Sequence, residues 1–236
     1  MSSKNIVITG ASKGMGKSIA AAFANEANNF FLCARNEVNL YKTVTELQTR
    51  FPKSNFNAMP VDLSIKEQCV LFGNWINERC TAVDILVNNA GMFVPGSVYN
   101  ESDGILEKMM ATNLYSAYHV TRTLIANMIA AKKGHIFNIC SIAAQQAYTN
   151  GGNYSISKFA LLGFSKNLRE ELKPHQIKVT AVLPGAVFTD SWIDFDNSNH
   201  RIMEASDIAA MIVAATKLSP AAVVEEIVLR PQAGDL

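Results

Sequence analysis

Cysteines, clustered metal-ligand residues and long apolar runs are scarce in this sequence of 236 residues, and each shortage excludes a class of protein. The four cysteines, Cys33, Cys69, Cys80 and Cys140, show no Cys-x-x-Cys spacing. We therefore expect buried, reduced thiols rather than a disulfide framework or a zinc site. The four histidines form no ligand pattern and are expected at the surface or in packing, so no metal site is predicted.

Charge of one sign is not in excess either, because the sequence has 21 basic and 20 acidic residues and a formal net charge of +1. Neither nucleic acid nor an anionic membrane is an expected partner, since both attract clustered positive charge. The apolar segment 208–215 lies between Asp207 and Lys217 and is too short to cross a bilayer. Residues 1–4 lead directly into a predicted strand without an apolar signal core, which predicts a cytoplasmic protein.

The sequence instead contains short apolar runs that alternate with helix-length segments, with 49% hydrophobic and 17% charged residues. Strands are predicted at residues 5–9, 29–33, 55–61, 83–88, 134–140, 177–183 and 223–229. Helices are predicted at residues 16–27, 38–51, from a Ser64–Glu67 capping box onward, 102–131, 153–172 and 207–217. This alternation predicts the α/β class, as a doubly wound Rossmann-type three-layer sandwich around a seven-stranded parallel sheet.

No proline- or glycine-rich linker and no repeat of fixed period divides the chain. Residues 1–236 are therefore expected to form a single domain of this Rossmann type. The irregular segment 186–205, rich in Asp, Asn, Ser and Thr, is predicted to be a short substrate lid, because long loops inside compact domains are usually functional.

A glycine-rich turn, Thr-Gly-Ala-Ser-Lys-Gly-Met-Gly at residues 9–16, joins the first predicted strand to the first predicted helix. In this position backbone N–H groups and a helix N-terminus can bind an anion, and we expect the pyrophosphate of a dinucleotide. Gly10, Gly14 and Gly16 would also suit an ordinary tight turn, so the remaining sequence must decide between the two interpretations.

The end of the second predicted strand indicates which dinucleotide is bound. An acidic residue about 20 residues after such a turn often binds the ribose 2′-hydroxyl, but this chain has Ala34-Arg35-Asn36. Arg35, with Lys13 from the glycine-rich turn, can pair with a 2′-phosphate. NADP(H) is therefore the predicted coenzyme and NAD(H) the alternative, unless both cations are ordinary solvated charges.

Residues 154–158, Tyr-Ser-Ile-Ser-Lys, open the helix that follows the fifth predicted strand. Because positions i and i+4 share a helix face, the Lys158 ammonium can lie beside the Tyr154 phenol and lower its pKa. Such a phenol can serve as a general acid or base. Taken alone, Tyr-x-x-x-Lys on a helix is more often a surface pair than not, but Ser141 follows the fifth strand at the same edge of the sheet.

Several motifs occur in one order along the chain: Thr-Gly-x-x-x-Gly-x-Gly at 9–16, Asp62, Asn-Asn-Ala-Gly at 88–91, Asn113, Ser141, Tyr-x-x-x-Lys at 154–158 and Pro-Gly-x-Val-x-Thr at 184–189. Over nearly its whole length the sequence resembles the short-chain dehydrogenase/reductase family. The resemblance implies an oxidoreductase that transfers a hydride between NADP(H) and a carbonyl or secondary alcohol, such as a small ketone or a 3-oxoacyl thioester. The alternative is a non-catalytic NADP(H)-binding sensor or interaction protein.

The resemblance also implies a role for each motif residue. Tyr154 would be the proton donor, Ser141 would hold the substrate oxygen, Lys158 would bind the nicotinamide ribose and lower the pKa of Tyr154, and Asn113 would support a water-linked proton relay. Together with the residues argued above, the coenzyme-binding set is Gly10, Ser12, Lys13, Gly14, Met15, Gly16, Arg35, Asp62, Leu63, Asn89, Ala90, Gly91, Tyr154, Lys158, Pro184, Gly185, Val187 and Thr189.

Candidates for the substrate pocket follow strand-end motifs or lie in the expected lid: Phe93, Ala143, Tyr148, Trp192 and Phe195. Aromatic residues also serve ordinary packing, but a roomy, partly aromatic site suits a neutral ketone or aldehyde as the small-molecule substrate. The helices at 102–131 and 153–172 correspond to those through which similar enzymes associate, so a homodimer or homotetramer is expected. Residues 229–236 depart from the family, many of whose members are glycine-rich there.

Overall fold

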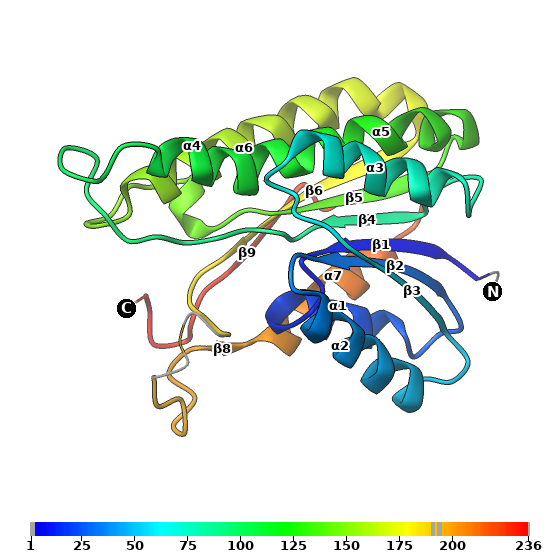
Figure 1. Ribbon diagram of the computed structural model, residues 1–236, viewed down its shortest axis with the longest axis horizontal. Coiled ribbons are helices and arrows are strands. Elements are labelled where there is room, and N and C mark those ends of the chain that lie inside the picture. Colours follow the sequence, from blue (N-terminus) through cyan, green and yellow to red (C-terminus); the bar gives the residue numbers. More distant parts are fainter. Residues whose placement is uncertain (1–2, 190–191, 193–194, 236) are drawn as a thin grey trace.

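Seven strands form one parallel sheet in the order β3-β2-β1-β4-β5-β6-β9. The computed structural model describes residues 3–189, 192 and 195–235 (Figure 1). The strands of this sheet are β1 (Asn5–Thr9), β2 (Asn29–Ala34), β3 (Asn55–Pro60), β4 (Ile85–Asn88), β5 (Gly134–Ile139), β6 (Ile177–Pro184) and β9 (Glu226–Leu229). The predicted seven-stranded, doubly wound parallel sheet is confirmed.

Helices cover both faces of the sheet and complete the three layers (Figure 1). On one face lie α1 (Gly14–Phe23), α2 (Glu37–Arg50) and α7 (Ala205–Thr216). On the other lie α3 (Lys66–Asn77), α4 (Ile105–Met110), α5 (Ser116–Ala131) and α6 (Gly152–Leu172). Short 3₁₀ turns at Ile142–Ala144 and Lys173–His175 complete the crossovers. Because parallel strands need crossovers, helices cover both faces, and the central strands β1, β4, β5 and β6 are almost entirely buried.

Successive side chains of the central strand β1 point to opposite faces of the sheet, and the core is divided accordingly into two layers. Ile6 and Ile8 of β1 pack in a cluster that includes Ile212 of α7. Val7, between them, packs in a second cluster that includes Leu124 of α5. All five side chains are fully buried. The period of two along the strand thus directs one set of side chains to each helix layer.

The capping box predicted at Ser64 and Glu67 is wrong. Helix α3 begins at Lys66, and Ile65 occupies its N-cap position. The Ser64 hydroxyl and backbone N–H both donate to Oδ1 of Asp62, at 2.7 and 2.9 Å. Ser64 therefore bonds to the Asp62 carboxylate in a local turn before the helix starts and does not cap the helix. Short polar side chains commonly form such turns.

The helix predicted at 102–131 is interrupted. A π-helical turn at Ala111–Tyr115 separates α4 from α5. Helix α1 is also shorter than predicted and ends at Phe23, whose carbonyl oxygen accepts a hydrogen bond from Asn28 Nδ2 at 2.9 Å. At the end of α1 this side-chain hydrogen bond satisfies a terminal carbonyl group, which hydrophobic periodicity does not report.

The predicted lid contains a small sheet that the sequence pattern did not indicate. Strand β7 (Val187–Phe188) pairs in parallel with β8 (Met203–Glu204). A capping box between Glu204 and Asp207 then starts α7. Positions 190, 191, 193 and 194 of the lid lie outside the described residues.

The segment that follows β9 lies against the start of the lid. The backbone N–H of Gly185 donates to the carbonyl oxygen of Leu229 at 2.8 Å. The Arg201 guanidinium donates to the carbonyl oxygens of Gly234 and Asp235 at 2.9 and 3.1 Å. Although it lacks the glycine-rich sequence, this segment is tied to β6 and to the lid.

All four cysteines are free thiols, as predicted, and three of them are buried: Cys33, Cys69 and Cys140. Within the described ranges, no three histidine, cysteine or acidic side chains gather in a way that could hold a metal ion. Across the same part of the chain, no helix is both long enough and apolar enough to cross a membrane. The cytoplasmic location stays a prediction.

Candidate active site

The glycine-rich turn adopts a backbone geometry that its three glycines make accessible. Gly10 and Gly14 have φ values of +64° and +53°, in the left-handed region that favours glycine. A Cβ on Gly16 would lie 2.4 Å from the carbonyl oxygen of Gly10. Lys13 occupies the N-cap position of α1, and a lysine side chain carries no acceptor for the first-turn N–H groups. Those donors and the helix dipole are therefore oriented to receive an anion.

The end of β4 is bonded directly to this turn. Thr9 Oγ1 accepts hydrogen bonds from the backbone N–H groups of Asn89 and Ala90, both at 2.9 Å. Asn89 Nδ2 donates in return to the carbonyl oxygens of Thr9 and Gly10, at 2.8 and 3.1 Å. Two of the predicted coenzyme-binding motifs are thus brought together across neighbouring strands.

The next strand ends provide a charged pair beside the turn. Burial pushes the pKa of Asp62 up, but hydrogen bonds from Ser64 and the cation of Arg35 outweigh it, so the pKa lies below its ordinary value. Arg35 follows β2 directly and is exposed, and Asp62 follows β3. The predicted cation is therefore accessible at the edge where a 2′-phosphate would lie, with Asp62 close enough to interact with it.

Tyr154 and Ser141 lie together at the carboxyl ends of the strands. Ser141 follows β5, and its Oγ accepts a hydrogen bond from the Ala143 N–H at 3.1 Å. A hydrogen bond joins the side chains of Ser141 and Tyr154. Tyr154 is the third residue of α6, whose first turn starts at Gly152. Two hydroxyl groups are therefore positioned to contact one small polar atom of a ligand.

Lys158 is buried beneath this pair. Its side chain is 4% exposed, and Nζ donates to the carbonyl oxygen of Ile139 at 2.8 Å. Nζ also lies 5.6 Å from the centroid of the Tyr154 ring. Burial lowers the pKa of Lys158 from 10.5 to about 8, because a low-dielectric environment disfavours the ammonium ion. The tyrosine and lysine of the motif therefore share one face of α6, as their spacing predicts.

The expected lowering of the Tyr154 pKa is not found. Burial raises the pKa of the phenol, the hydrogen bond with Ser141 opposes this, and Cys140 raises it further. The physical reason is that removing the phenolate from water costs more than the surrounding groups recover. In the coenzyme-free protein Tyr154 is consequently a protonated acid at neutral pH.

Asn113, in the π-helical turn, connects three segments of the site. Its Oδ1 accepts from the Met92 N–H at 2.7 Å, and its Nδ2 donates to the Met92 carbonyl oxygen at 3.0 Å. Nδ2 also donates to Ser157 Oγ at 2.9 Å, and Ser157 Oγ donates to the Tyr154 carbonyl oxygen at 2.7 Å. The side chain of Asn113 thus fixes the loop after β4 against the first turns of α6. A π-turn at such a point is a frequent feature of functional sites.

Sequence reasoning missed Ser157. It lies three residues after Tyr154 and one before Lys158, so all three share a helix face, and this periodicity was the available signal. The sequence also showed no sign of a buried series of side-chain hydrogen bonds, in which Asn88 Nδ2 donates to Asn138 Oδ1 at 2.8 Å. Asn138 Nδ2 in turn donates to Ser165 Oγ at 2.8 Å, and no local pattern indicates such a contact between strands and helix.

Two of the five predicted substrate-pocket residues lie beside Tyr154. The Phe93 ring meets the Tyr154 ring edge to face, with centroids 5.0 Å apart and planes at 81°. Burial raises the pKa of Tyr148 to about 12, and the electrostatic interaction with Tyr154 adds to this, so the two phenols are near enough to interact. Ala143 is 2% exposed, so little of its surface can touch a ligand.

The lid candidates form a pair of their own. Trp192 and Phe195 contact each other edge to face at 5.4 Å. Thr189, at the start of the lid, approaches the glycine-rich turn, because a Cβ on Gly14 would lie 3.4 Å from its Cγ2. Val187 is buried in β7. The structure therefore brings Thr189 to the expected coenzyme edge.

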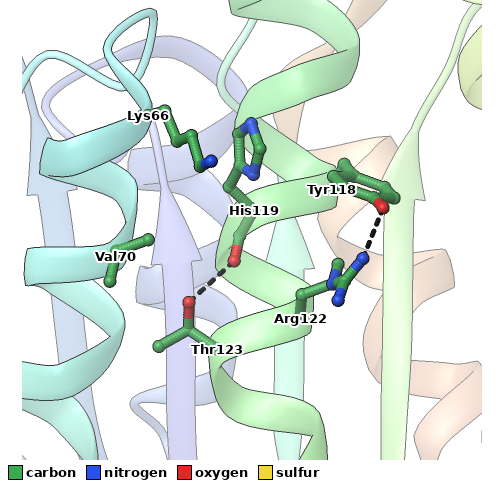
Figure 2. A pocket seen from close by; sticks show the side chains of 6 residues that line it. All are labelled: Lys66, Val70, Tyr118, His119, Arg122 and Thr123. Atoms are coloured by element: carbon green, nitrogen blue, oxygen red, sulfur yellow. Dashed lines mark hydrogen bonds between the residues drawn. The ribbon is translucent and has the colours of Figure 1, made fainter.

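A separate cavity of about 420 Å³ opens between α3 and α5 (Figure 2). It is lined by Lys66, Val70, Tyr118, His119, Arg122 and Thr123, none of which is a predicted site residue. Figure 2 shows the Lys66 side chain pointing toward the His119 ring. Burial lowers the pKa of His119, and the cations of Lys66 and Arg122 lower it further. The cavity is distinct from the cluster around Tyr154.

Comparison with known proteins agrees with this geometry. The family described as short chain dehydrogenase matches residues 4–199. A sepiapterin reductase of Chlorobaculum tepidum is 34% identical over 98% of this chain and 97% of its own length.

Solved structures show the same likeness over the whole fold. A metagenomic short-chain oxidoreductase in complex with NADP is 29% identical, with a TM-score of 0.84 and 97% of each chain covered. An actinorhodin polyketide ketoreductase with NADPH is 28% identical, with a TM-score of 0.88, over 99% of this chain and 98% of its own. The order of motifs, the seven-stranded sheet and the matched family lead to one conclusion: this chain belongs to the short-chain dehydrogenase/reductase family.

Proposed function

We propose that the protein is an NADP(H)-dependent oxidoreductase that reduces a carbonyl group to an alcohol. The observation that carries the proposal is the convergence of Tyr154, Ser141, Lys158 and Asn113 at one edge of the sheet. A protein that only bound a dinucleotide would need the glycine-rich turn but not this set of hydroxyl, ammonium and amide groups.

The residues at the strand ends fit the coenzyme. Because Gly16 has no Cβ, the first turn of α1 packs directly against the carbonyl oxygen of Gly10, and the first-turn N–H groups of α1 would hold the pyrophosphate. Lys13 and Arg35 would hold the 2′-phosphate, which favours NADP(H) over NAD(H). When bound, the nicotinamide supplies or accepts a hydride. The other proposed contacts are Ser12, Met15, Asp62, Leu63, Asn89, Ala90, Gly91, Pro184, Gly185, Val187 and Thr189.

The protein's own part in the reduction is to orient the carbonyl and to deliver a proton. Tyr154 keeps its proton at neutral pH, because the ordinary pKa of a phenol is near 10 and burial raises it further, so its hydroxyl can donate to a developing alkoxide. Ser141 Oγ, hydrogen-bonded to the same phenol, would hold the carbonyl oxygen. Lys158 places a positive charge 5.6 Å from the ring, which favours transient loss of the proton. In the oxidation direction Tyr154 must accept a proton, so alkaline pH favours that direction.

The experiment is a panel of carbonyl compounds followed by the loss of NADPH absorbance, with NADH in parallel. The panel contains neutral ketones and aldehydes, a 3-oxoacyl thioester and sepiapterin, the last two chosen from the names of similar reductases. We expect at least one carbonyl to be reduced, and faster with NADPH than with NADH.

The matched control is Tyr154→Phe, which removes one hydroxyl group. It should bind NADPH with unchanged affinity and lose turnover. Substantial residual kcat would refute the role of Tyr154. Tight NADPH binding without reduction of any carbonyl would favour the sensor or interaction protein instead.

We also propose that the protein associates with itself through α5 and α6. Three large side chains on or beside these helices, Tyr115, Ile156 and Phe159, are 49%, 41% and 46% exposed. Covering such apolar surface favours association into a homodimer or homotetramer. A sedimentation mass equal to one chain of 25.7 kDa would contradict this proposal.

A further inference from the structure

Two half-exposed aromatic side chains flank the proposed proton donor. Phe93 is 44% exposed and Tyr148 is 46% exposed, although both lie beside the Tyr154 phenol. Uncovered aromatic surface next to a reacting group is surface that a substrate can cover. Phe93 comes from the loop after β4 and Tyr148 from the loop after β5, so the two rings approach from different segments.

The two loops are joined to each other, so these rings are held in place before a substrate arrives. The Gly96 N–H donates to the Asn150 carbonyl oxygen at 3.0 Å, and the Gly152 N–H donates to the Gly96 carbonyl oxygen at 3.2 Å. Ser97 Oγ adds a hydrogen bond to Asn150 Oδ1 at 3.1 Å. The joined loops therefore form one unit that carries both aromatic side chains.

The contact of Tyr148 with its own loop fixes its ring as well. A Cβ on Gly151 would lie 2.5 Å from the Tyr148 ring, so the ring packs directly on the glycine backbone. Asn150, beside it, has a φ of +59°, a conformation that asparagine tolerates better than most residues. The ring position is thus built into the backbone three residues before Tyr154.

We infer that the carbonyl substrate carries a planar aromatic ring close to its reacting carbon, which packs against Phe93 and Tyr148. This inference rests on the proposed function. A carbonyl oxygen held by Ser141 and Tyr154 places the groups on its carbon beside the rings that flank the phenol. Aromatic pairs gain attraction from their quadrupoles in addition to the area they bury, so a phenyl group gains more here than a saturated ring of similar size.

The test compares phenylacetone with cyclohexylacetone as substrates. Neither carbonyl is conjugated with the ring, so their intrinsic reactivity is similar and the ratio of kcat/KM reports the ring itself. We expect wild-type protein to favour phenylacetone about fivefold, as one or two aromatic contacts would give. The ratio should fall toward one in Phe93→Leu and in Tyr148→Leu, with NADPH affinity unchanged.

Tyr41→Leu is the control, because Tyr41 is 44% exposed on α2, outside the joined loops, and its replacement should leave the ratio unchanged. A wild-type ratio near one, or a ratio that Phe93→Leu leaves unchanged, would overturn the inference while the proposed function stands. A protein that binds NADPH and reduces no carbonyl of either panel would overturn both.

Discussion

The buried lysine of the site makes a quantitative prediction about stability. Burial lowers the pKa of Lys158 from 10.5 to about 8. One pKa unit corresponds to about 1.36 kcal/mol, so keeping the ammonium ion in the folded, coenzyme-free protein costs about 3 kcal/mol at pH 7. Lys158→Met removes this cost, but it also removes the hydrogen bond to the Ile139 carbonyl oxygen, worth about 1–3 kcal/mol for a charged donor. The net difference at neutral pH is therefore a small gain in stability.

The change of that difference with pH is the sharper result. In the unfolded chain a lysine keeps its proton up to its ordinary pKa of 10.5, whereas folded Lys158 loses its proton near pH 8. Between these values the unfolded state binds more protons, so wild-type stability rises with pH relative to the methionine variant. We expect the advantage of Lys158→Met to shrink by about 2–3 kcal/mol between pH 7 and pH 10.

The measurement is urea unfolding of both proteins at fixed protein concentration across this pH range, without coenzyme. Lys53→Met, at an exposed position, is the matched control and should show no such trend. A difference between wild type and Lys158→Met that stays constant from pH 7 to pH 10 would show that the lysine is not held in a desolvated environment.

Three further substitutions test other parts of the site, and a fourth, at Gly163, is the control for the change at Gly16. Ser157→Ala removes the hydroxyl group to which Asn113 Nδ2 donates. Because a lost buried hydrogen bond costs ~1–2 kcal/mol, kcat should fall about tenfold, while the Kd for NADPH stays unchanged. Ser157→Thr should restore activity. Arg35→Asp should raise the Kd for NADPH about 10- to 100-fold and leave that for NADH nearly unchanged, as expected for a charge-assisted phosphate contact; equal effects on both would contradict the assignment. Gly16→Ala places a Cβ 2.4 Å from a backbone carbonyl oxygen, so it should cost roughly 1–3 kcal/mol of stability and abolish NADPH binding. Gly163→Ala, whose Cβ would meet nothing within 4 Å, should be stabilising by about 1 kcal/mol in the same unfolding assay.

Most of the fold could be predicted from the sequence, because the buried parallel strands are mostly apolar and are separated by helix-length segments. The strand β5 shows this well, since it was predicted at 134–140 and is observed at Gly134–Ile139. Boundaries that depend on one side-chain hydrogen bond were missed. Ser64 donates its hydroxyl hydrogen bond to the Asp62 carboxylate instead of capping α3, and hydrophobic periodicity contains no information about this choice of partner.

The candidate site was predictable where its chemistry lies within one motif or at one strand end. Tyr154 and Lys158 share a helix face, and their separation of four residues is sufficient to place them together. The direction of the Tyr154 pKa shift was predicted wrongly, because the extent of burial depends on the whole fold and outweighs the hydrogen bond with Ser141. The contact between Asn113 and Ser157 spans 44 residues and was invisible for the same reason. The roles of these residues in catalysis stay predictions.

The bonds between the glycine-rich turn and the end of β4 also affect how the chain folds during synthesis. Thr9 lies 80 residues before Asn89, whose backbone and side chain complete the turn. At roughly 5–20 residues per second, a ribosome reaches Asn89 about 4 to 16 s after it has added Thr9. Because non-local contacts must await their distant partner, the N-terminal strand and helix emerge with an incomplete turn. The anion-binding geometry is therefore a late product of translation, although its own residues are among the first to be made.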